Sequence, residues 1–454
     1  GRGLAGGGGV PSRRVEVFDR VDRLAAPRLV EDWEQDPCYV EEPEEDYDRE
    51  AIYETGAAPP MPELEGDLGV TIEAEFAVGE YQIVILSAAD SSGLETWLRQ
   101  ENYNIPDGAE ARLRPYVEAG SKFFVAKVDV SKVTFGEEGV AQLSPLRVHY
   151  TSEAFELPIR LGLVNAAGAQ DLIVHVLARN QRFELANRPN VTIPTNIDVN
   201  DSVRDRFGPF YVALFDETVR RNPGAVVTEY AWQATNCDPC PGPVLTVEDL
   251  TLLGGDVIDP GANGEPAVRS VGWGNDYVLT RLHARYEASA VEDDLVFRAA
   301  NAIVGGREFV HGPNGLEHGS RPATANNFQG RYAIRHAWDK PITCENPVRG
   351  RWGGPWGDEA QPETRAAGDL AYADRNAVRL PDAVRSRVPE LELAASAAFA
   401  GAAPTNALAQ SEADDEAGAT EEEDDGCGCR TARGSDALWL LALGAVLLAR
   451  RRRI

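Results

Sequence analysis

Two cysteines separated by two residues, Cys237 and Cys240, form the motif with the most obvious reactivity. A four-residue turn brings its first and last residues within about 7 Å, which is inside disulfide reach. A redox site would place the pair at the start of a helix, whose dipole lowers the thiol pKa, but Pro241-Gly242-Pro243 follows and breaks a helix. Zinc would need a second paired-ligand motif. We therefore expect a structural disulfide, with pairing to Cys38 or Cys344, redox chemistry and zinc as the alternatives.

The chain has six cysteines, of which Cys427 and Cys429 lie near its end. The even number left in the body suits an oxidising compartment, where disulfides persist. Four cysteines permit three pairings, and the sequence does not choose among them. The disulfide candidates are Cys38, Cys237, Cys240 and Cys344.

The histidines offer a second kind of chemistry. Their spacing does not match His-Glu-x-x-His, and the sequence has neither a Gly-x-Ser-x-Gly elbow nor a Gly-x-x-x-x-Gly-Lys phosphate loop. Three histidines fall in strand-like segments and are expected to be ordinary sheet residues: His149, His175 and His283. Three others lie in or near a glycine- and asparagine-containing loop and could form a hydrolytic site: His311, His318 and His336.

Two groups of side-chain oxygens have the composition of a calcium site. The first group is Asp198, Asn200, Asp201 and Asp205, and the second is Asp256, Asp259, Asn263 and Glu265. Helix capping explains part of the first group, and a polar turn explains the second. We therefore predict no metal, no cofactor and no catalytic residue from these patterns.

Hydrophobic spacing predicts the elements that position these residues. We expect a helix over Val15–Asp36, interrupted at Pro27, and a hairpin with Gly79 at its turn. Helices are predicted after Asp90 or Ser91, over Ala109–Ala119, from Asn200 or Asp201 to Arg221, and after a capping box at Thr246. Strands are predicted at Val70–Phe76, Tyr81–Leu86, Lys122–Val130, Leu146–Thr151, Leu157–Val164, Leu172–Ala178, Val191–Pro194, Val226–Trp232 and Tyr277–Tyr286.

These elements predict an α+β fold of mostly antiparallel sheets with flanking helices. From about 305 to 360 the many Gly, Asn, Arg and Trp residues suggest ordered loops. The expected parts are an N-terminal helical segment (1–40), an acidic and proline-containing linker (41–67), an α+β unit (68–195), a second loop-rich α+β unit that could be continuous with the first (196–385), a disordered acidic spacer (386–436) and a transmembrane or sorting segment (437–454).

The C-terminal segment has the composition of a membrane anchor. Nine of the fifteen residues from 411 to 425 are acidic, which favours a solvated spacer. An unbroken apolar run, Ala437–Ala449, follows and is about 20 Å long as a helix, against about 30 Å of hydrocarbon core. Snorkelling by Arg450, Arg451, Arg452 and Arg453 and local bilayer thinning could close this gap. The arginines also predict a cytoplasmic C-terminus and a body outside the membrane.

A Gly-Cys pair, a short apolar helix and terminal arginines occur in this order, and together they resemble the myxobacterial-type C-terminal sorting sequence (MYXO-CTERM). The resemblance covers about 28 residues. It implies recognition by a sorting protease in the membrane, cleavage near the cysteines and transfer to the cell surface. It also implies that Cys427 or Cys429 is the processing or lipid-attachment position.

The overall charge limits the classes of partner. The formal net charge is −29, which opposes binding to nucleic acid or to anionic lipid surfaces. The chain opens Gly-Arg-Gly-Leu without an initiating methionine or a signal-peptide pattern. We therefore expect either that the start has been processed or that the chain is a fragment.

Three features of the body resemble one known family. They are the string from Asp19 to Leu29, the Cys237–Pro241 element, and Arg335-His336 followed by Cys344-Glu345-Asn346-Pro347. Over roughly residues 15–360 the chain is similar to a domain-of-unknown-function family of exported bacterial proteins (number twenty-three thirty). The resemblance implies export but no activity, cofactor or catalytic residue.

The sequence thus favours an exported envelope protein, anchored at the membrane or outer surface, with a non-catalytic structural or binding role. The alternative is an envelope enzyme that uses the paired cysteines or the loop histidines.

Overall fold

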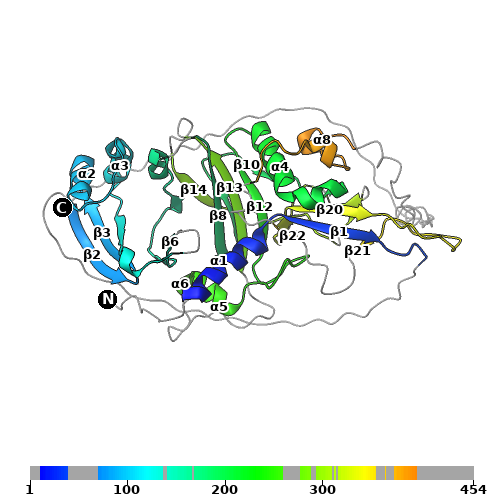
Figure 1. Ribbon diagram of the computed structural model, residues 1–454, viewed down its shortest axis with the longest axis horizontal. Helices are drawn as coiled ribbons and strands as arrows, with labels where there is room; N and C mark the ends of the chain where they lie inside the picture. The colour runs from blue at the N-terminus through cyan, green and yellow to red at the C-terminus, as the bar shows by residue number, and fades with distance from the viewer. Residues whose placement is uncertain are drawn as a thin grey trace, which may run out of the picture. The chain divides into compact units, whose positions relative to one another are not determined.

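The computed structural model describes residues 11–38, 70–135, 141–165, 168–258, 277–287, 293–308, 311–312, 315–317, 319–353, 363–364 and 373–395. All of these residues belong to one compact unit, within Gly1–Thr405. The described part is α+β with mostly antiparallel sheets, as the sequence predicts. Its larger elements are drawn in Figure 1.

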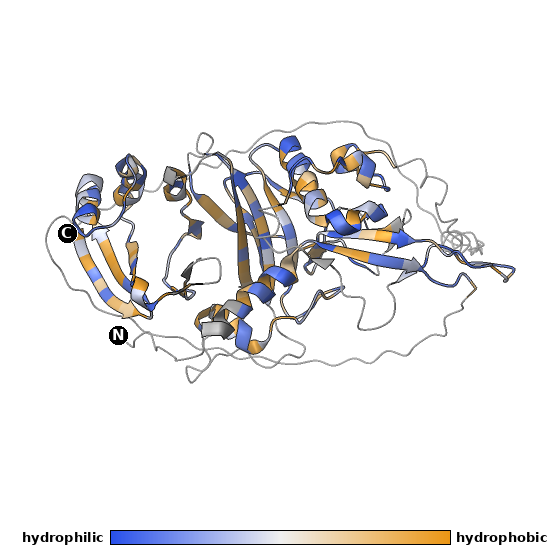
Figure 2. Cartoon of the chain, in the orientation of Figure 1, coloured by the Kyte–Doolittle hydropathy of each residue, from blue (hydrophilic) through white to orange (hydrophobic). Residues whose placement is uncertain are grey.

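The largest sheet has seven strands in the order β18-β15-β19-β12-β13-β8, with β10 also paired to β12. Strand β13 lies between β12 and the edge strand β8 and is antiparallel to β8 from Tyr277↔Arg179 to Tyr286↔Gln170. The strands are β8 (Gln170–Arg179), β10 (Asn190–Thr192), β12 (Val226–Gln233), β13 (Tyr277–Tyr286), β15 (Ile303–Gly305), β18 (Arg321–Pro322) and β19 (Asn327–Gln329). Hydrophilic positions interrupt the hydrophobic colouring of the central strands (Figure 2).

A second, five-stranded sheet joins the two ends of the described body. Its strands are β1 (Arg28–Glu34), β11 (Ile197–Val199), β20 (Arg331–His336), β21 (Trp352–Gly353) and β22 (Glu363–Thr364). In this sheet β1 runs parallel to β20, from Arg28↔Arg331 to Trp33↔His336. The two strands lie side by side in Figure 1 although about 300 residues separate them.

Helix α4 (Phe207–Arg221) packs against residues of both sheets. Its buried Phe207, Phe210 and Tyr211 form ring contacts with Tyr332 of β20. The same core includes Val227 of β12. A 3₁₀ turn (Asp201–Arg206) leads into the helix, and α8 (Leu380–Ala383) and a 3₁₀ turn (Pro389–Leu391) pack on it.

Helix α1 (Pro11–Ala25) covers another part of the seven-stranded sheet. Its buried Val21 and Leu24 pack with Tyr230 and Trp232 of β12 and with Leu279 of β13. The short α5 (Val247–Leu250), a π-helical turn (Thr251–Gly255) and α6 (Asp256–Ile258) follow the capping box at Thr246.

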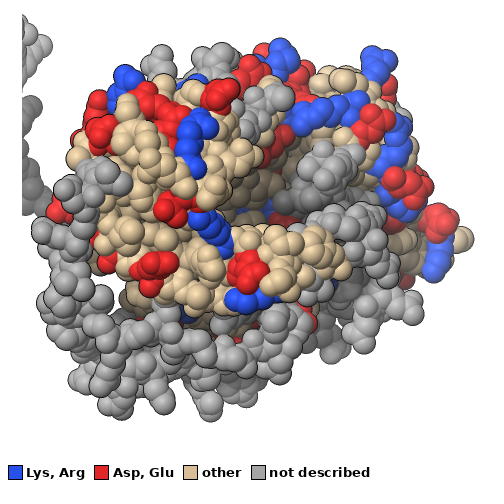
Figure 3. Space-filling model, turned by 60° about the vertical axis from the view of Figure 1, so that its left-hand side comes forward, with Lys and Arg blue, Asp and Glu red and all other residues tan. Residues whose placement is uncertain are grey.

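A smaller layer holds β2 (Val70–Val78), β3 (Tyr81–Ala88) and β4 (Phe123–Val128) under α2 (Ser91–Gln100) and α3 (Ala109–Glu118). Asp90 caps α2 by accepting a hydrogen bond from the Gly93 N–H. On the face shown in Figure 3, acidic and basic side chains are interspersed. Pairs such as Arg99–Glu95 on α2 show how such neighbours bond one turn apart on a helix.

The remaining described strands are short. A three-stranded sheet contains β7 (Glu156–Leu157), β9 (Arg182–Leu185) and β14 (Leu295–Ala300), and two-stranded pairs are formed by β5 (Thr134–Phe135) with β6 (Ala141–Gln142) and by β16 (His311–Gly312) with β17 (Gly315–Leu316). Two 3₁₀ turns cover Val130–Lys132 and Arg160–Asn165.

Most predicted elements are confirmed, but four predictions are wrong. The helix over Val15–Asp36 ends at Ala25, because Pro27 disfavours helical backbone before it and the chain continues as β1. Leu146–Thr151 forms no strand, and Leu157–Val164 is mostly a 3₁₀ turn. The region from 305 to 360 was expected to be loops, yet it supplies β20, an interior strand of the second sheet.

None of the described helices combines the length and apolar character needed to cross a bilayer. The predicted membrane span at 437–454 lies outside the described residues, as do most of the 386–436 spacer and the 41–67 linker.

Candidate functional site

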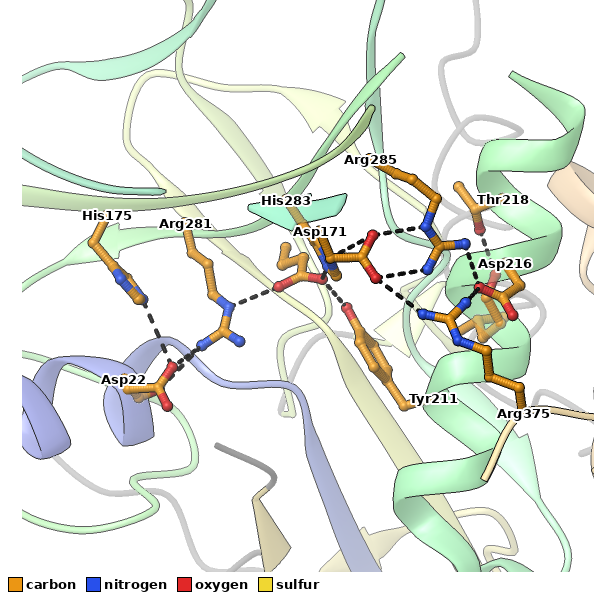
Figure 4. A network of polar contacts seen from close by, with 12 residues as sticks. Asp22, Asp171, His175, Tyr211, Asp216, Thr218, Arg281, His283, Arg285 and Arg375 are labelled. Carbon is orange, nitrogen blue, oxygen red and sulfur yellow. Dashed lines mark hydrogen bonds and ion pairs between the residues drawn. The ribbon is translucent and has the colours of Figure 1, made fainter. Parts of the chain in front are cut away.

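A row of charged and polar side chains runs through the interior from α1, across the seven-stranded sheet, to α4 (Figure 4). We call it the buried ionic network. Its members are Asp22, Asp171, His175, Tyr211, Asp216, Glu229, Arg281, His283, Arg285 and Arg375.

Strand geometry aligns the basic members of this network. Arg281, His283 and Arg285 alternate along β13, so they lie on one side of the strand. Glu229 lies on the neighbouring β12, close to a register shift between Thr228 and Tyr230. This alternation is visible in the sequence. The sequence predicted that His283 is an ordinary sheet residue, but it did not predict which side chains His283 contacts.

Glu229 is the centre of the network and is fully buried. Its carboxylate accepts hydrogen bonds from the Tyr211 hydroxyl (2.5 Å) and from Arg281 Nε (2.7 Å), and it lies 2.7 Å from His283 Nδ1. Burial alone would raise the pKa of Glu229, but the charges of His283 and Arg281 outweigh burial and lower it to about 2. Glu229 is therefore ionised at neutral pH.

The imidazole of His283 is held on three sides. Its ring stacks on Phe215 of α4 at 3.7 Å between centroids, and its Nδ1 faces Glu229. Its Nε2 lies 3.8 Å from Asp171 Oδ1. Asp171 and Asp216 are in turn bridged by Arg285 and Arg375. Both ring nitrogens thus face carboxylates that belong to the same network.

The other end of the network attaches α1 to the sheet. Arg281 Nη1 bonds Asp22 Oδ1 at 2.5 Å, and His175 Nε2 lies 4.0 Å from the same oxygen. Burial and the neighbouring charge of Arg281 lower the pKa of His175 to about 4. His175 is therefore neutral at pH 7, and the ionic contact here is between Asp22 and Arg281.

A second charged layer lies on the five-stranded sheet. Arg331 of β20 pairs with Asp32 of β1 at 3.0 Å, and Arg335 pairs with Asp198 of β11 at 3.0 Å. Arg28, at the start of β1, is fully buried and donates to the Pro239 carbonyl (2.7 Å) and the Leu24 carbonyl (2.6 Å). The sequence did not predict the pairing of Arg331 with Asp32 or of Arg335 with Asp198, because the two members of each pair are far apart in the chain.

All four cysteines proposed as disulfide partners are paired. One disulfide joins Cys237 to Cys240, and a second joins Cys38 to Cys344, which are 306 positions apart in the chain. The structure therefore contains the local pairing expected within the Cys-x-x-Cys motif. The processing candidates Cys427 and Cys429, and the arginines at 450–453, lie outside the described residues.

Two carboxyl groups, one within the Cys237–Cys240 loop and one next to it, have raised pKa values. Burial raises the pKa of Asp238. Burial, together with the nearby Asp32 and Asp238, also raises the pKa of Glu308, against the opposing effect of Arg331. The backbone N–H of Glu308 donates to Asp238 Oδ2 at 3.4 Å.

The structure does not bring the predicted loop histidines together as far as it describes them. His336 bonds Glu31 at 2.7 Å and stacks on Trp33. The backbone of His311 belongs to β16, while its side chain and the whole of His318 lie outside what the structure describes. His149 is exposed.

The predicted calcium groups have other partners where they are described. Asn200 caps the 3₁₀ turn that follows it, Asp198 pairs with Arg335, and Asp256 pairs with Arg147. Within the described ranges, no three His, Cys, Asp or Glu side chains are grouped closely enough to hold a metal ion. Asp259, Asn263 and Glu265 lie outside those ranges.

Comparison with known proteins gives one match. No curated protein and no solved structure matches the chain. A family model described as an uncharacterized protein conserved in bacteria (DUF2330) matches residues 10–298, which include α1, the buried ionic network up to Arg285 and the Cys237–Cys240 loop. The family resemblance expected from the sequence is thereby confirmed, and the chain belongs to this uncharacterized bacterial family.

Proposed function

We propose that the chain is an exported envelope protein whose globular part functions outside the cytoplasmic membrane. In this proposal residues 437–454 hold it at the membrane or direct it to the cell surface. The globular part has a structural or binding role and presents its surface to other envelope components.

The disulfide between Cys38 and Cys344 is the observation that carries this proposal. It connects the residues that follow β1 to the segment that leads into β21, and together with Cys237–Cys240 it uses every cysteine before the tail. Disulfides of this kind form and persist in oxidising compartments and are rare in the cytosol. The pairing therefore supports export.

The composition of the tail supports anchoring. Ala437–Ala449 is apolar and is followed at once by four arginines, Arg450–Arg453. Basic residues next to an apolar segment favour the cytoplasmic side of the membrane. The acidic run before the segment provides a solvated spacer between the body and the bilayer.

The pairing within the buried ionic network supports a structural or binding role for the body. Glu229 contacts Tyr211, Arg281 and His283, and the outer carboxylates contact Arg285 and Arg375. These bonds connect α1, β12, β13, β8 and α4. Their contribution is to fix the helices on the sheet, which gives a stable outer surface.

Cell fractionation of a tagged full-length precursor tests the proposal. The chain is expected in the membrane or surface fraction, and mass spectrometry is expected to place its mature C-terminus near Cys427 or Cys429. Deletion of 437–454 should release the body, while a control deletion of equal length within 396–425 should leave it attached. An intact chain that stays in the cytosol with its C-terminus uncut would contradict the proposal.

A further inference from the structure

The two cysteines of the Cys237–Cys240 disulfide differ in how far each residue is exposed to solvent. Cys237 is buried, with 8% of its surface exposed, whereas Cys240 is exposed. Only three positions separate the two residues, so their bond closes a very small loop. An incoming thiol can therefore reach Cys240 but not Cys237.

Hydrogen bonds hold this loop in place without help from the disulfide. Arg28 donates to the Pro239 carbonyl, and Gln329 donates to the Asp238 carbonyl. The N–H of Cys237 itself donates to Asn236 Oδ1 at 2.7 Å. These contacts come from β1, β19 and the loop itself and do not involve the sulfur–sulfur bond, so we expect them to remain when that bond opens.

A buried cation lies against the loop. The guanidinium of Arg28 is fully buried against the loop, and burial lowers its pKa only to about 10, so it stays charged at neutral pH. A fixed positive charge close to a cysteine stabilises the ionised sulfur and makes it a better leaving group. In this loop the guanidinium contacts the carbonyl of Pro239, which lies between the two cysteines, and the carboxyl of Asp238, whose pKa burial raises, belongs to the same loop.

We propose that the Cys237–Cys240 disulfide is a thiol–disulfide exchange site at which a thiol of another envelope protein becomes bonded to Cys240. The thiolate of the partner attacks Cys240 Sγ, and a new sulfur–sulfur bond forms between them. The bond from Cys240 to Cys237 breaks, and its electron pair leaves with Cys237 as a thiolate near Arg28. The step exchanges one disulfide for another and needs no further oxidant or reductant. It would give the body a covalent but reversible attachment to its partner.

The disulfide from Cys38 to Cys344 provides an internal control. It links segments 306 residues apart, and both of its residues are only partly exposed. The purified full-length chain is placed in glutathione redox buffers, quenched with acid and alkylated. The redox state of each pair is then read from its own peptides, so that the tail cysteines are scored separately.

The Cys237–Cys240 pair is expected to open at a glutathione ratio about tenfold less reducing than the Cys38–Cys344 pair. The tryptophan fluorescence of the folded chain should stay unchanged over that interval. If the pair opens only together with unfolding, or after Cys38–Cys344, the proposal is overturned.

Two single substitutions test which sulfur is attacked. C237S leaves Cys240, which should form a mixed disulfide with 5,5′-dithiobis(2-nitrobenzoate) at least about tenfold faster than Cys237 does in C240S, because exposure governs access. Equal rates, or faster reaction of Cys237, would overturn the assignment. If either variant fails to fold, the glutathione measurement on the unchanged chain still decides the proposal. Both assays use purified protein, so their outcome does not depend on where the chain is located in the cell.

Discussion

Burying Glu229 removes a carboxylate from water, and Tyr211, Arg281 and His283 replace the lost solvation. A buried charge that loses one partner is costly, because the remaining charge has neither water nor a counterion. The ion pairs on the surface of α2 and α3 contribute less to the stability of the fold, because water screens their charges and their side chains must be ordered to form them.

Replacing Glu229 by Gln keeps the shape of the side chain but removes the negative charge that Arg281 and His283 face. We expect the free energy of unfolding to fall by about 3–5 kcal/mol. Urea unfolding followed by circular dichroism measures it. The control is E95Q, which removes the exposed partner of Arg99 and should cost about 0–1 kcal/mol. Equal effects of the two substitutions would show that the network does not stabilise the fold.

Acidification should weaken the fold through His175. Burial and Arg281 lower the pKa of His175 from 6.5 to about 4, so the unfolded chain binds a proton at a pH at which the folded chain does not. Its stabilising contribution is complete above pH 6.5 and is lost as the pH falls toward 4, by roughly 3 kcal/mol.

Unfolding free energies of H175Q between pH 7 and pH 4 test this sign. The decline over that interval should be shallower than in the unchanged chain, while H149Q, at an exposed position, should leave the slope as it was. A steeper decline in H175Q would contradict the assignment.

At the residue scale, sequence reasoning recognised the cysteines but not the ionic network. An even count and a Cys-x-x-Cys spacing are local facts, and they led to the disulfides that the structure contains. The choice of Cys38 for Cys344 depends on the parallel pairing of β1 with β20, which no local pattern contains. Likewise, Asp22 and Arg281 are 259 residues apart.

At the scale of elements, local signals were sufficient where the stabilising bonds are local. Asp90 caps α2, Thr246 forms a capping box, and Gly79 sits in the hairpin turn, all as expected. The strand Arg28–Glu34 was missed, because its hydrophobic residues also suit a helix and its partner strand lies about 300 residues away.

Gly306 is required at the position directly after β15, where the backbone comes close to β19. Its φ is +72°, and a Cβ there would lie 2.1 Å from the Gln329 carbonyl oxygen. G306A should therefore lower the free energy of unfolding by about 3–5 kcal/mol, from backbone strain and from the clash with main chain. G79A is the matched control, because Gly79 also has a positive φ but has nothing within 4 Å of the added carbon. It should cost only about 1–2 kcal/mol. Thermal unfolding of both variants distinguishes strain from steric exclusion, and equal losses would show that the close approach to β19 is unimportant.

At the scale of the whole molecule, the two disulfides should differ in their contribution to stability. The chain-entropy model assigns about 6 kcal/mol to a link across some 300 residues and about 2 kcal/mol to one across three. The double variant C38S/C344S should therefore unfold at a clearly lower denaturant concentration than C237S/C240S. The reverse order would mean that the small loop, rather than the long link, holds the body together.

The sequence also predicted the α+β class, because hydrophobic patterns typical of strands and helices occur along the whole body. It predicted the family from three short features, one of which contains the Cys237–Cys240 pair. It did not predict that β1, near the start of the described chain, and β20, near its end, pair in one sheet. That arrangement depends on long-range pairing between β1, β11 and β20.

The redox state of Cys38 and Cys344 inside living cells tests the central claim, that this body folds and works outside the cytoplasm. Cells producing the full-length precursor are quenched with acid and alkylated, and the peptides of the envelope fraction are analysed by mass spectrometry. If the body folds outside the cytoplasm, Cys38 and Cys344 will be recovered there as one disulfide-linked pair. Recovery of both cysteines as alkylated thiols in a folded, cytosolic chain would contradict it.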